Sequence, residues 1–189
     1  MNKKKFFKKL INISRPIILL FLSLFFEKKY LNSHHFLVGY AGYKWAFRSI
    51  WQRSILRLGP SLPFPASVNC FISNTNNLKF HPDDLNNFQT NGTYFQNMSA
   101  YIVIGKGSFI APNVGLITAN HNPSDLNEHL PSKDVIIGNN CWIGMNSVIL
   151  PGVEIASNTI VAAGSVVTKS FLEGACMIGG TPAKTIKKL

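Results

Sequence analysis

The sequence predicts a mainly β protein in which short strands coil into a parallel β-helix, preceded by a helical segment. Two observations predict this fold class. Aliphatic residues recur at every sixth position through the second half of the chain, and the first third is basic, aromatic and free of that period. A period of six fits neither an α-helix, with a period of about 3.6, nor a simple strand, with a period of about two.

The six-residue repeat is the primary signal, because an internal repeat decides the architecture before any local propensity. Its aliphatic anchors are Ile104, Ile110, Leu116, Ile137, Ile143, Ile149, Ile155, Val161 and Val167. A small or β-branched residue follows most anchors four positions later: Ser108, Val114, Cys141, Ser147, Val153, Thr159 and Ser165. We expect each anchor to point inward and to stack on the next coil at the strand spacing of about 4.8 Å.

One interruption breaks the repeat. Leu116 and Ile137 are 21 positions apart instead of six, so fifteen residues, roughly 122–136, leave the coil. Irregular segments of this length are uncommon in compact domains and tend to be functional. His121 stands immediately before the predicted loop, in "ITANHNPSDLNEH".

The positive charge lies outside the repeat. Residues 1–60 contain twelve Lys and Arg against the single acid Glu27, whereas residues 61–189 contain seven charges of each sign. The net charge of +11 therefore does not predict a nucleic-acid-binding repeat domain. The apolar run from Pro16 to Phe26 is eleven residues long, which is short for a membrane span. Glu27 and two lysines occupy the place of a signal-peptide cleavage site.

Residues 1–58 combine cations with bulky apolar and aromatic side chains, including a second segment from Tyr40 to Leu58. This mixture predicts binding to an anionic membrane surface, on the cytoplasmic face of the inner membrane. The alternative is that these helices cap the open end of the coil or pack between subunits. The run "GPSLPFP", Gly59 to Pro65, ends the helical segment.

These boundaries predict three regions. Residues 1–62 form the basic helical segment, 63–178 the β-helix with degenerate early coils over 66–103, and 179–189 a C-terminal tail. The three cysteines have neither metal-ligand nor disulfide spacing, so we expect Cys141 in the core and a reducing cytoplasm. The five histidines do not fall at the repeat spacing that a three-histidine zinc site would need: His34, His35, His81, His121 and His129.

Three stretches carry a family resemblance: "IGKGSFIAPNV", "IGNNCWIGMNSVILPGVEIASNTIVAAGSVVTKS" and "GGTPAK". They resemble the hexapeptide-repeat acyltransferases, and most of all the galactoside and maltose O-acetyltransferases and the O-acetyltransferases of bacterial surface polysaccharides. The resemblance covers about 94–187. It implies a left-handed coil with three hexapeptides per turn, a homotrimer, and acetyl-CoA as co-substrate without a metal.

The resemblance also implies site residues. A histidine placed like His121 is the general base in this family, and an imidazole with its ordinary pKa of about 6.5 suits proton transfer near neutral pH. Asn97 matches an asparagine that holds the acceptor. Asp125 or Glu128 could orient the imidazole or meet the acceptor, and the spacing does not decide between them.

The donor side is carried over in the same way. Trp142 matches a tryptophan beside the acyl-donor channel, and Met145 stands where the galactoside enzymes have serine. The full set implied for acetyl-CoA is Trp142, Gly144, Met145, Ala163, Thr168, Lys169, Lys184 and Lys187.

Together these observations predict an acetyl-CoA-dependent O-acetyltransferase that acts directly on a sugar hydroxyl of a capsule or O-antigen, or of its lipid-linked precursor. The first alternative is N-acetylation of an amino sugar or acetylation of a small acceptor. The alternative outside enzymes is a β-helix scaffold, which would leave His121, the loop and "TPAK" without a role.

Overall fold

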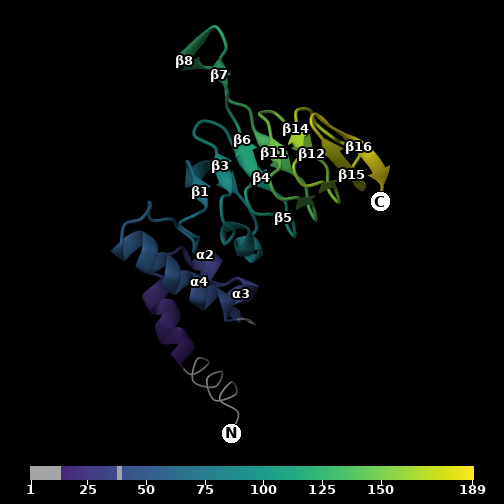
Figure 1. Cartoon of the computed structure of the whole chain (residues 1–189). Helices are drawn as coiled ribbons and strands as arrows, with labels where there is room; N and C mark the ends of the chain where they lie inside the picture. The colour runs from purple at the N-terminus through teal and green to yellow at the C-terminus, as the bar shows by residue number, and fades with distance from the viewer. Residues whose placement is uncertain (1–13, 38–39) are drawn as a thin grey trace. The chain divides into compact units, whose positions relative to one another are not determined.

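The computed structural model describes residues 14–37 and 40–189, and the chain forms two compact units, Met1–Pro65 and Ala66–Leu189 (Figure 1). The boundary lies three residues beyond the one that the sequence predicts. The lysine-rich stretch "KKKFFKKL" lies outside the described residues.

Three sheets of short parallel strands build the second unit (Figure 1). One sheet orders β1 (Phe71–Ile72), β3 (Tyr94–Gln96), β6 (Gly115–Ile117), β11 (Val148–Ile149) and β14 (Val166–Val167). Another orders β2 (Leu78–Lys79), β4 (Ile102–Ile104), β9 (Val135–Ile137) and β12 (Glu154–Ile155). The last orders β5 (Phe109–Ile110), β10 (Trp142–Ile143), β13 (Ile160–Val161), β15 (Cys176–Gly180) and β16 (Ala183–Lys188).

The strand register shows the length of one coil. Trp142 pairs with Ile160, Val148 with Val166 and Ile136 with Glu154, and each pair is 18 positions apart. Eighteen positions are three six-residue repeats, so the chain visits each sheet once per coil. The predicted mainly β fold of parallel hexapeptide coils is therefore confirmed.

The inward residues are those that the repeat selects. All nine anchors are at most 3% exposed, and the small residues that precede them by two positions are buried with them. Several corners place an asparagine in the left-handed backbone region, at Asn113, Asn140, Asn146 and Asn158. Asparagine tolerates a positive φ better than most residues, because its short polar side chain bonds locally. The Asn-rich corners thus let short strands turn onto the next face.

The early coils are longer and less regular, as the sequence predicts for 66–103. Phe71 pairs with Tyr94 and Leu78 with Ile102, which are 23 and 24 positions apart. The 3₁₀ turns η2 (Thr75–Asn77) and η3 (Pro82–Phe88) account for the extra residues. Leu85, Phe88 and Phe95 are fully buried there, so large side chains replace the regular aliphatic stack.

The end of the chain differs from the tail that the sequence predicts. Residues of β16 pair antiparallel with β15 across the turn at Thr181 and Pro182. Ala183 is buried, while the residues of β16 that follow it are exposed. The last residues are therefore an edge strand of a sheet.

The first unit is helical. Residues 14–22 form a helix, followed by α2 (Lys28–Leu31), α3 (His34–Leu37), α4 (Ala41–Ser49) and the π-helical turns of η1 (Ile50–Ile55). Its buried side chains include Leu22, Phe26, Tyr30, Phe36 and Tyr43. Within the described residues, we find no helix with the length and apolar character that a bilayer crossing requires.

Candidate active site

A hairpin leaves the coil between β6 and β9 (Figure 1). Phe109 pairs with Trp142 and Gly115 with Val148, at spacings of 33 positions, which is fifteen more than one regular coil. The predicted length of the insertion is therefore the observed one. Its strands are β7 (His121–Asn122) and β8 (Asp125–His129), which pair antiparallel.

The hairpin begins and ends earlier than predicted. Its stem closes where Lys133 donates its amide N–H to the carbonyl of Thr118, at 2.8 Å. Val135 and Ile137 are already buried in β9 and pair with Ile102 and Ile104, so 135–136 belong to the coil. The predicted bounds miss this because Val135 occupies the small position of the repeat, two residues before an anchor.

His121 lies at the start of β7 with an exposed side chain, and one backbone contact fixes its ring. Its Nδ1 atom is 2.8 Å from the carbonyl oxygen of Leu126. A carbonyl oxygen only accepts, so this bond requires the proton on Nδ1. The lone pair then sits on Nε2, which is the form in which an imidazole accepts a proton from a substrate.

The rest of the hairpin is built from local polar contacts. The His121 and His129 rings lie against each other across the strand pair, with centroids 4.3 Å apart and ring planes tilted by 35°. Asn122 donates to the Glu128 carboxylate at 3.1 Å, and Asp125 accepts from the Asn127 amide at 3.0 Å. Both acids are thus engaged with neighbouring asparagines, and the group that orients His121 is the carbonyl of Leu126. A backbone carbonyl carries no residue signature, so sequence reasoning had no signal for it.

Asn97 lies inside a corner of the coil. Its side chain is fully buried, accepts the amide of Asn74 at 3.1 Å and donates to the carbonyl of Asn74 at 2.7 Å. These bonds tie two successive coils together. The side-chain amide of Asn97 is therefore satisfied within the fold.

The predicted donor residues around Trp142 lie on neighbouring coils. Trp142 is an exposed residue of β10, in register with exposed Phe109 on β5 and with Ile160 on β13. Gly144 is packed so closely on the next coil that a Cβ would lie 2.6 Å from the amide nitrogen of Ala163. The carbonyl of Met145 accepts from Gly164 at 2.8 Å. Trp142, Met145 and Ala163 are exposed on these neighbouring coils, Gly144 is buried where the coils touch, and we call these four residues the donor strip.

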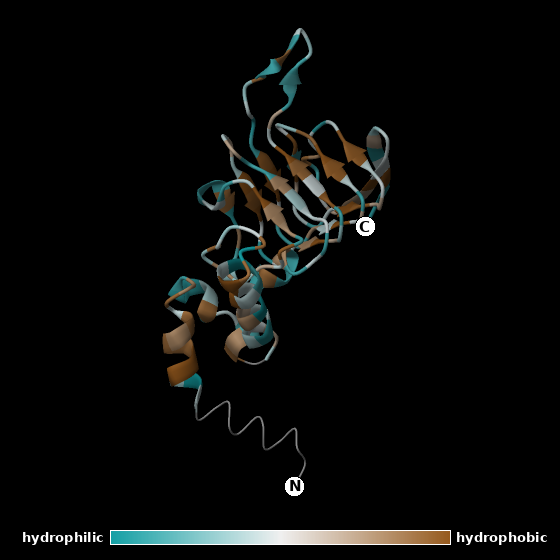
Figure 2. Cartoon of the chain, turned by 60° about the vertical axis from the view of Figure 1, so that its left-hand side comes forward, coloured by the Kyte–Doolittle hydropathy of each residue, from teal (hydrophilic) through white to brown (hydrophobic). Residues whose placement is uncertain are grey.

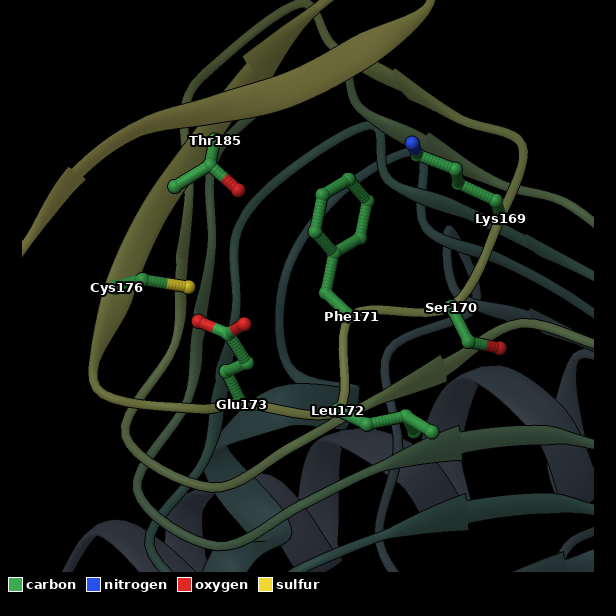
Figure 3. A pocket seen from close by; sticks show the side chains of 7 residues that line it. All are labelled: Lys169, Ser170, Phe171, Leu172, Glu173, Cys176 and Thr185. Carbon is green, nitrogen blue, oxygen red and sulfur yellow. The ribbon is translucent and has the colours of Figure 1, made fainter.

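The last coil holds a hollow of about 270 Å³ (Figure 3). Its walls are Lys169, Ser170, Phe171, Leu172, Glu173, Cys176 and Thr185. The Lys169 ammonium lies 5.8 Å from the centre of the Phe171 ring. Thr168 is exposed beside it, and Lys184 and Lys187 are exposed on β16. Of the predicted donor residues, Lys169 alone lines this hollow.

The cysteines lie in the core. Cys70, Cys141 and Cys176 are all buried as free thiols. Burial raises the pKa of the Cys141 thiol above its ordinary value, which keeps it protonated and weakly nucleophilic. The predicted core position of Cys141 is confirmed.

Residues 134–169 match the family model of the bacterial transferase hexapeptide, described as six repeats. This chain carries the hexapeptide repeat of bacterial transferases. The match covers the regular coils from β9 to β14, and it includes Trp142, Gly144, Met145, Ala163, Thr168 and Lys169.

Several relatives of this hexapeptide-repeat chain are acetyltransferases by name. The "Putative acetyltransferase YJL218W" of Saccharomyces cerevisiae is 42% identical over 54% of each chain. The "Putative lipopolysaccharide biosynthesis O-acetyl transferase WbbJ" of Escherichia coli is 36% identical over 46% of this chain and 50% of its own length. A solved structure of galactoside acetyltransferase in complex with coenzyme A superposes with a TM-score of 0.49 and 31% identity, covering 64% of this chain and 62% of that one. The chain spans about half the length of the curated relatives it matches.

Proposed function

We propose that the protein transfers an acetyl group from acetyl-CoA to a sugar hydroxyl, with His121 as the general base. One observation carries the proposal. The Leu126 carbonyl holds the proton on Nδ1 of His121, and the exposed ring is left with a lone pair on Nε2. The hexapeptide repeat and the acetyltransferase relatives support the reaction class.

The chemistry is a direct transfer. Acetyl-CoA supplies a thioester carbonyl that a hydroxyl oxygen can attack. Nε2 of His121 removes the hydroxyl proton as the new C–O bond forms, and the imidazolium returns that proton to the departing sulfur as the C–S bond breaks. The Leu126 carbonyl stabilises the transient imidazolium by accepting its Nδ1 proton. Cys141 is buried and protonated, so direct transfer agrees with the thiol's position.

The strip from Trp142 to Ala163 fits the donor. Small residues beside an exposed aromatic ring leave room for the narrow pantetheine arm of acetyl-CoA. Lys169, Lys184 and Lys187 suit the phosphates of coenzyme A, because these three lysines are exposed. Glu173 lines the nearby hollow and would repel a phosphate, so we assign the phosphates to the lysines and not to the hollow itself.

We also propose a left-handed coil and a homotrimer, as the family resemblance implies. The hairpin projects away from the coil within one chain (Figure 1). A hairpin that reached a neighbouring subunit would bring His121 to that subunit's donor strip. Exposed Phe109, Phe71 and Tyr94 give the coil apolar outward surface that such contacts would cover.

The acceptor that we propose is a surface polysaccharide or its lipid-linked precursor. The support is the likeness to a protein named for lipopolysaccharide biosynthesis, together with a hairpin that is largely hydrophilic (Figure 2) and exposes the amide and carboxylate groups of Asp125, Asn127 and Glu128. Such groups suit the hydroxyls of a sugar.

The experiment uses the full chain, acetyl-CoA labelled with ¹³C at the carbonyl, and a panel of neutral hexosides and amino sugars. We expect a labelled carbonyl on a sugar oxygen, released by hydroxylamine as esters are. A hydroxylamine-stable amide on an amino sugar would replace O-transfer by N-transfer. Labelled acetyl-CoA that stays bound but unreacted with every sugar would contradict the proposed acceptor class, and failure to bind acetyl-CoA would favour a scaffold.

A further inference from the structure

The helix of residues 14–22 is largely hydrophobic (Figure 2), and several of its apolar side chains are exposed to solvent. Ile17, Leu20, Phe21 and Leu24 are all exposed, and Ile17 and Leu24 are 73% and 77% exposed. Ile17, Leu20 and Phe21 are three and four positions apart, which places them on one helix face, and Leu24 follows in the turn after the helix. Helices of globular proteins normally bury such a face, so among the described residues this stripe lacks the cover that its pattern requires.

The stripe continues onto a second helix of the same unit. The Phe21 ring stacks on the Phe47 ring of α4, with centroids 6.4 Å apart. Phe47 is exposed, as are Trp51 and Ile55, which follow it on the same face through η1. We call this set, with the four residues above, the apolar face. Single exposed apolar residues are ordinary, but a contiguous set of this kind marks an interaction surface.

Cations border the apolar face. Lys28 lines a hollow of about 260 Å³ together with Leu19, Leu20 and Leu31. Lys44 is exposed on α4, three residues before Phe47. The single acid of residues 1–60, Glu27, is bonded to Lys29 at 2.7 Å. The charge next to the apolar face is therefore positive.

We propose that the apolar face binds an anionic membrane surface, with Ile17, Leu20 and Leu24 among the acyl chains and Lys28 and Lys44 at the lipid phosphates. Trp51 suits the headgroup level, where amphipathic rings gather, and Phe47 suits the apolar side of that boundary. The positive charge of this unit favours an anionic membrane as the partner of the apolar face. Each lysine near anionic lipid strengthens binding, and residues 1–60 carry eleven more positive than negative charges. The proposal concerns the first unit alone and does not depend on the acetyl-transfer reaction.

The experiment is flotation of the full chain with vesicles of phosphatidylcholine, with or without phosphatidylglycerol, at low and high salt. We expect flotation with the anionic vesicles, weakened by salt because the lysine contribution is screened. The double variant Ile17→Ser, Leu24→Ser should lower the partition coefficient at least about tenfold, since two buried aliphatic side chains are lost from the bilayer. Both positions are exposed in the folded unit, so its fold should survive, which circular dichroism checks.

The matched control is Leu189→Ser, which removes an exposed leucine from the other unit and should float like the wild type. Equal flotation of the double variant and the wild type would overturn the proposal. So would a wild type that ignores anionic vesicles at low salt. If the double variant instead changed the sedimentation coefficient while the wild type did not float, the apolar face would be an interface between copies of the chain.

Discussion

At Gly144, two successive coils lie so close together that there is no room for a side chain. A Cβ there would lie 2.6 Å from the amide nitrogen of Ala163 and 2.7 Å from the carbonyl oxygen of Val161. These are backbone atoms held by the sheet, so they have little freedom to move away. At Gly115 the nearest atoms to a Cβ are side-chain carbons at 3.7 and 3.8 Å, an ordinary contact.

This contrast predicts that an alanine at Gly144 and an alanine at Gly115 change the free energy of unfolding by different amounts. Gly144→Ala should lower the free energy of unfolding by about 1–3 kcal/mol, because the added methyl overpacks two coils. Gly115→Ala is the matched control and should change it by less than about 1 kcal/mol. Urea denaturation of both variants, without ligand, measures the difference. Equal stabilities would contradict the close packing at Gly144.

Single-residue predictions succeeded where the repeat fixes the geometry. The anchors and the corner residue Cys141 are buried, because their period matches the coil. Asn97 shows the limit of such reasoning. Both atoms of its amide bond the backbone of Asn74, 23 positions earlier, and this pairing depends on irregular early coils whose length the sequence does not reveal.

At the scale of elements, the hairpin is an insertion that the coil does not need. From Asn120 to Pro131 its side chains are exposed or partly exposed, and its contacts are mostly local. The spacing of the anchors predicts its length, because fifteen extra residues separate Leu116 from Ile137. The spacing does not predict that the insertion forms a hairpin or where it begins and ends, because its exposed polar residues show no hydrophobic periodicity.

The corresponding prediction concerns a shortened chain from which residues 119–133 are deleted. These fifteen residues are the inserted length, so Ile137 would follow Leu116 by six positions and Val135 would keep its corner place. We expect the shortened chain to keep its far-ultraviolet circular dichroism spectrum and to unfold cooperatively, while acetyl transfer is lost with His121. Unfolding of the shortened chain would contradict a self-contained hairpin.

At the scale of the whole molecule, the sequence predicted the division into a basic helical unit and a neutral coil. The helical first unit was predictable from composition, but its exposed apolar face was not, because hydrophobic periodicity does not tell which side of a helix is covered. The C-terminal strand β16 was missed for a related reason. Its residues after Ala183 are exposed and largely basic, and its place is set by pairing with β15.

The trimer is the prediction at this scale. Sedimentation equilibrium of the full chain should give the mass of three chains, because a closed cyclic contact would cover the exposed rings of Phe71, Tyr94 and Phe109. The stacked pair of Phe71 and Tyr94, with centroids 5.0 Å apart, offers a rigid surface for such a contact. A stable monomer with full transfer activity would contradict a site shared between subunits.

The most direct measurement of the central claim, that the hairpin presents His121 as the base, compares two histidine variants in acetyl transfer. His121→Ala should lower the rate of coenzyme A release in the presence of an accepted sugar by about 100-fold or more, the scale expected for loss of a general base. Acetyl-CoA binding, followed by calorimetry, should be unchanged. His129→Phe keeps a ring against His121 and should retain most of the wild-type rate. Near-normal turnover by folded His121→Ala, or an equal loss in His129→Phe, would contradict the account.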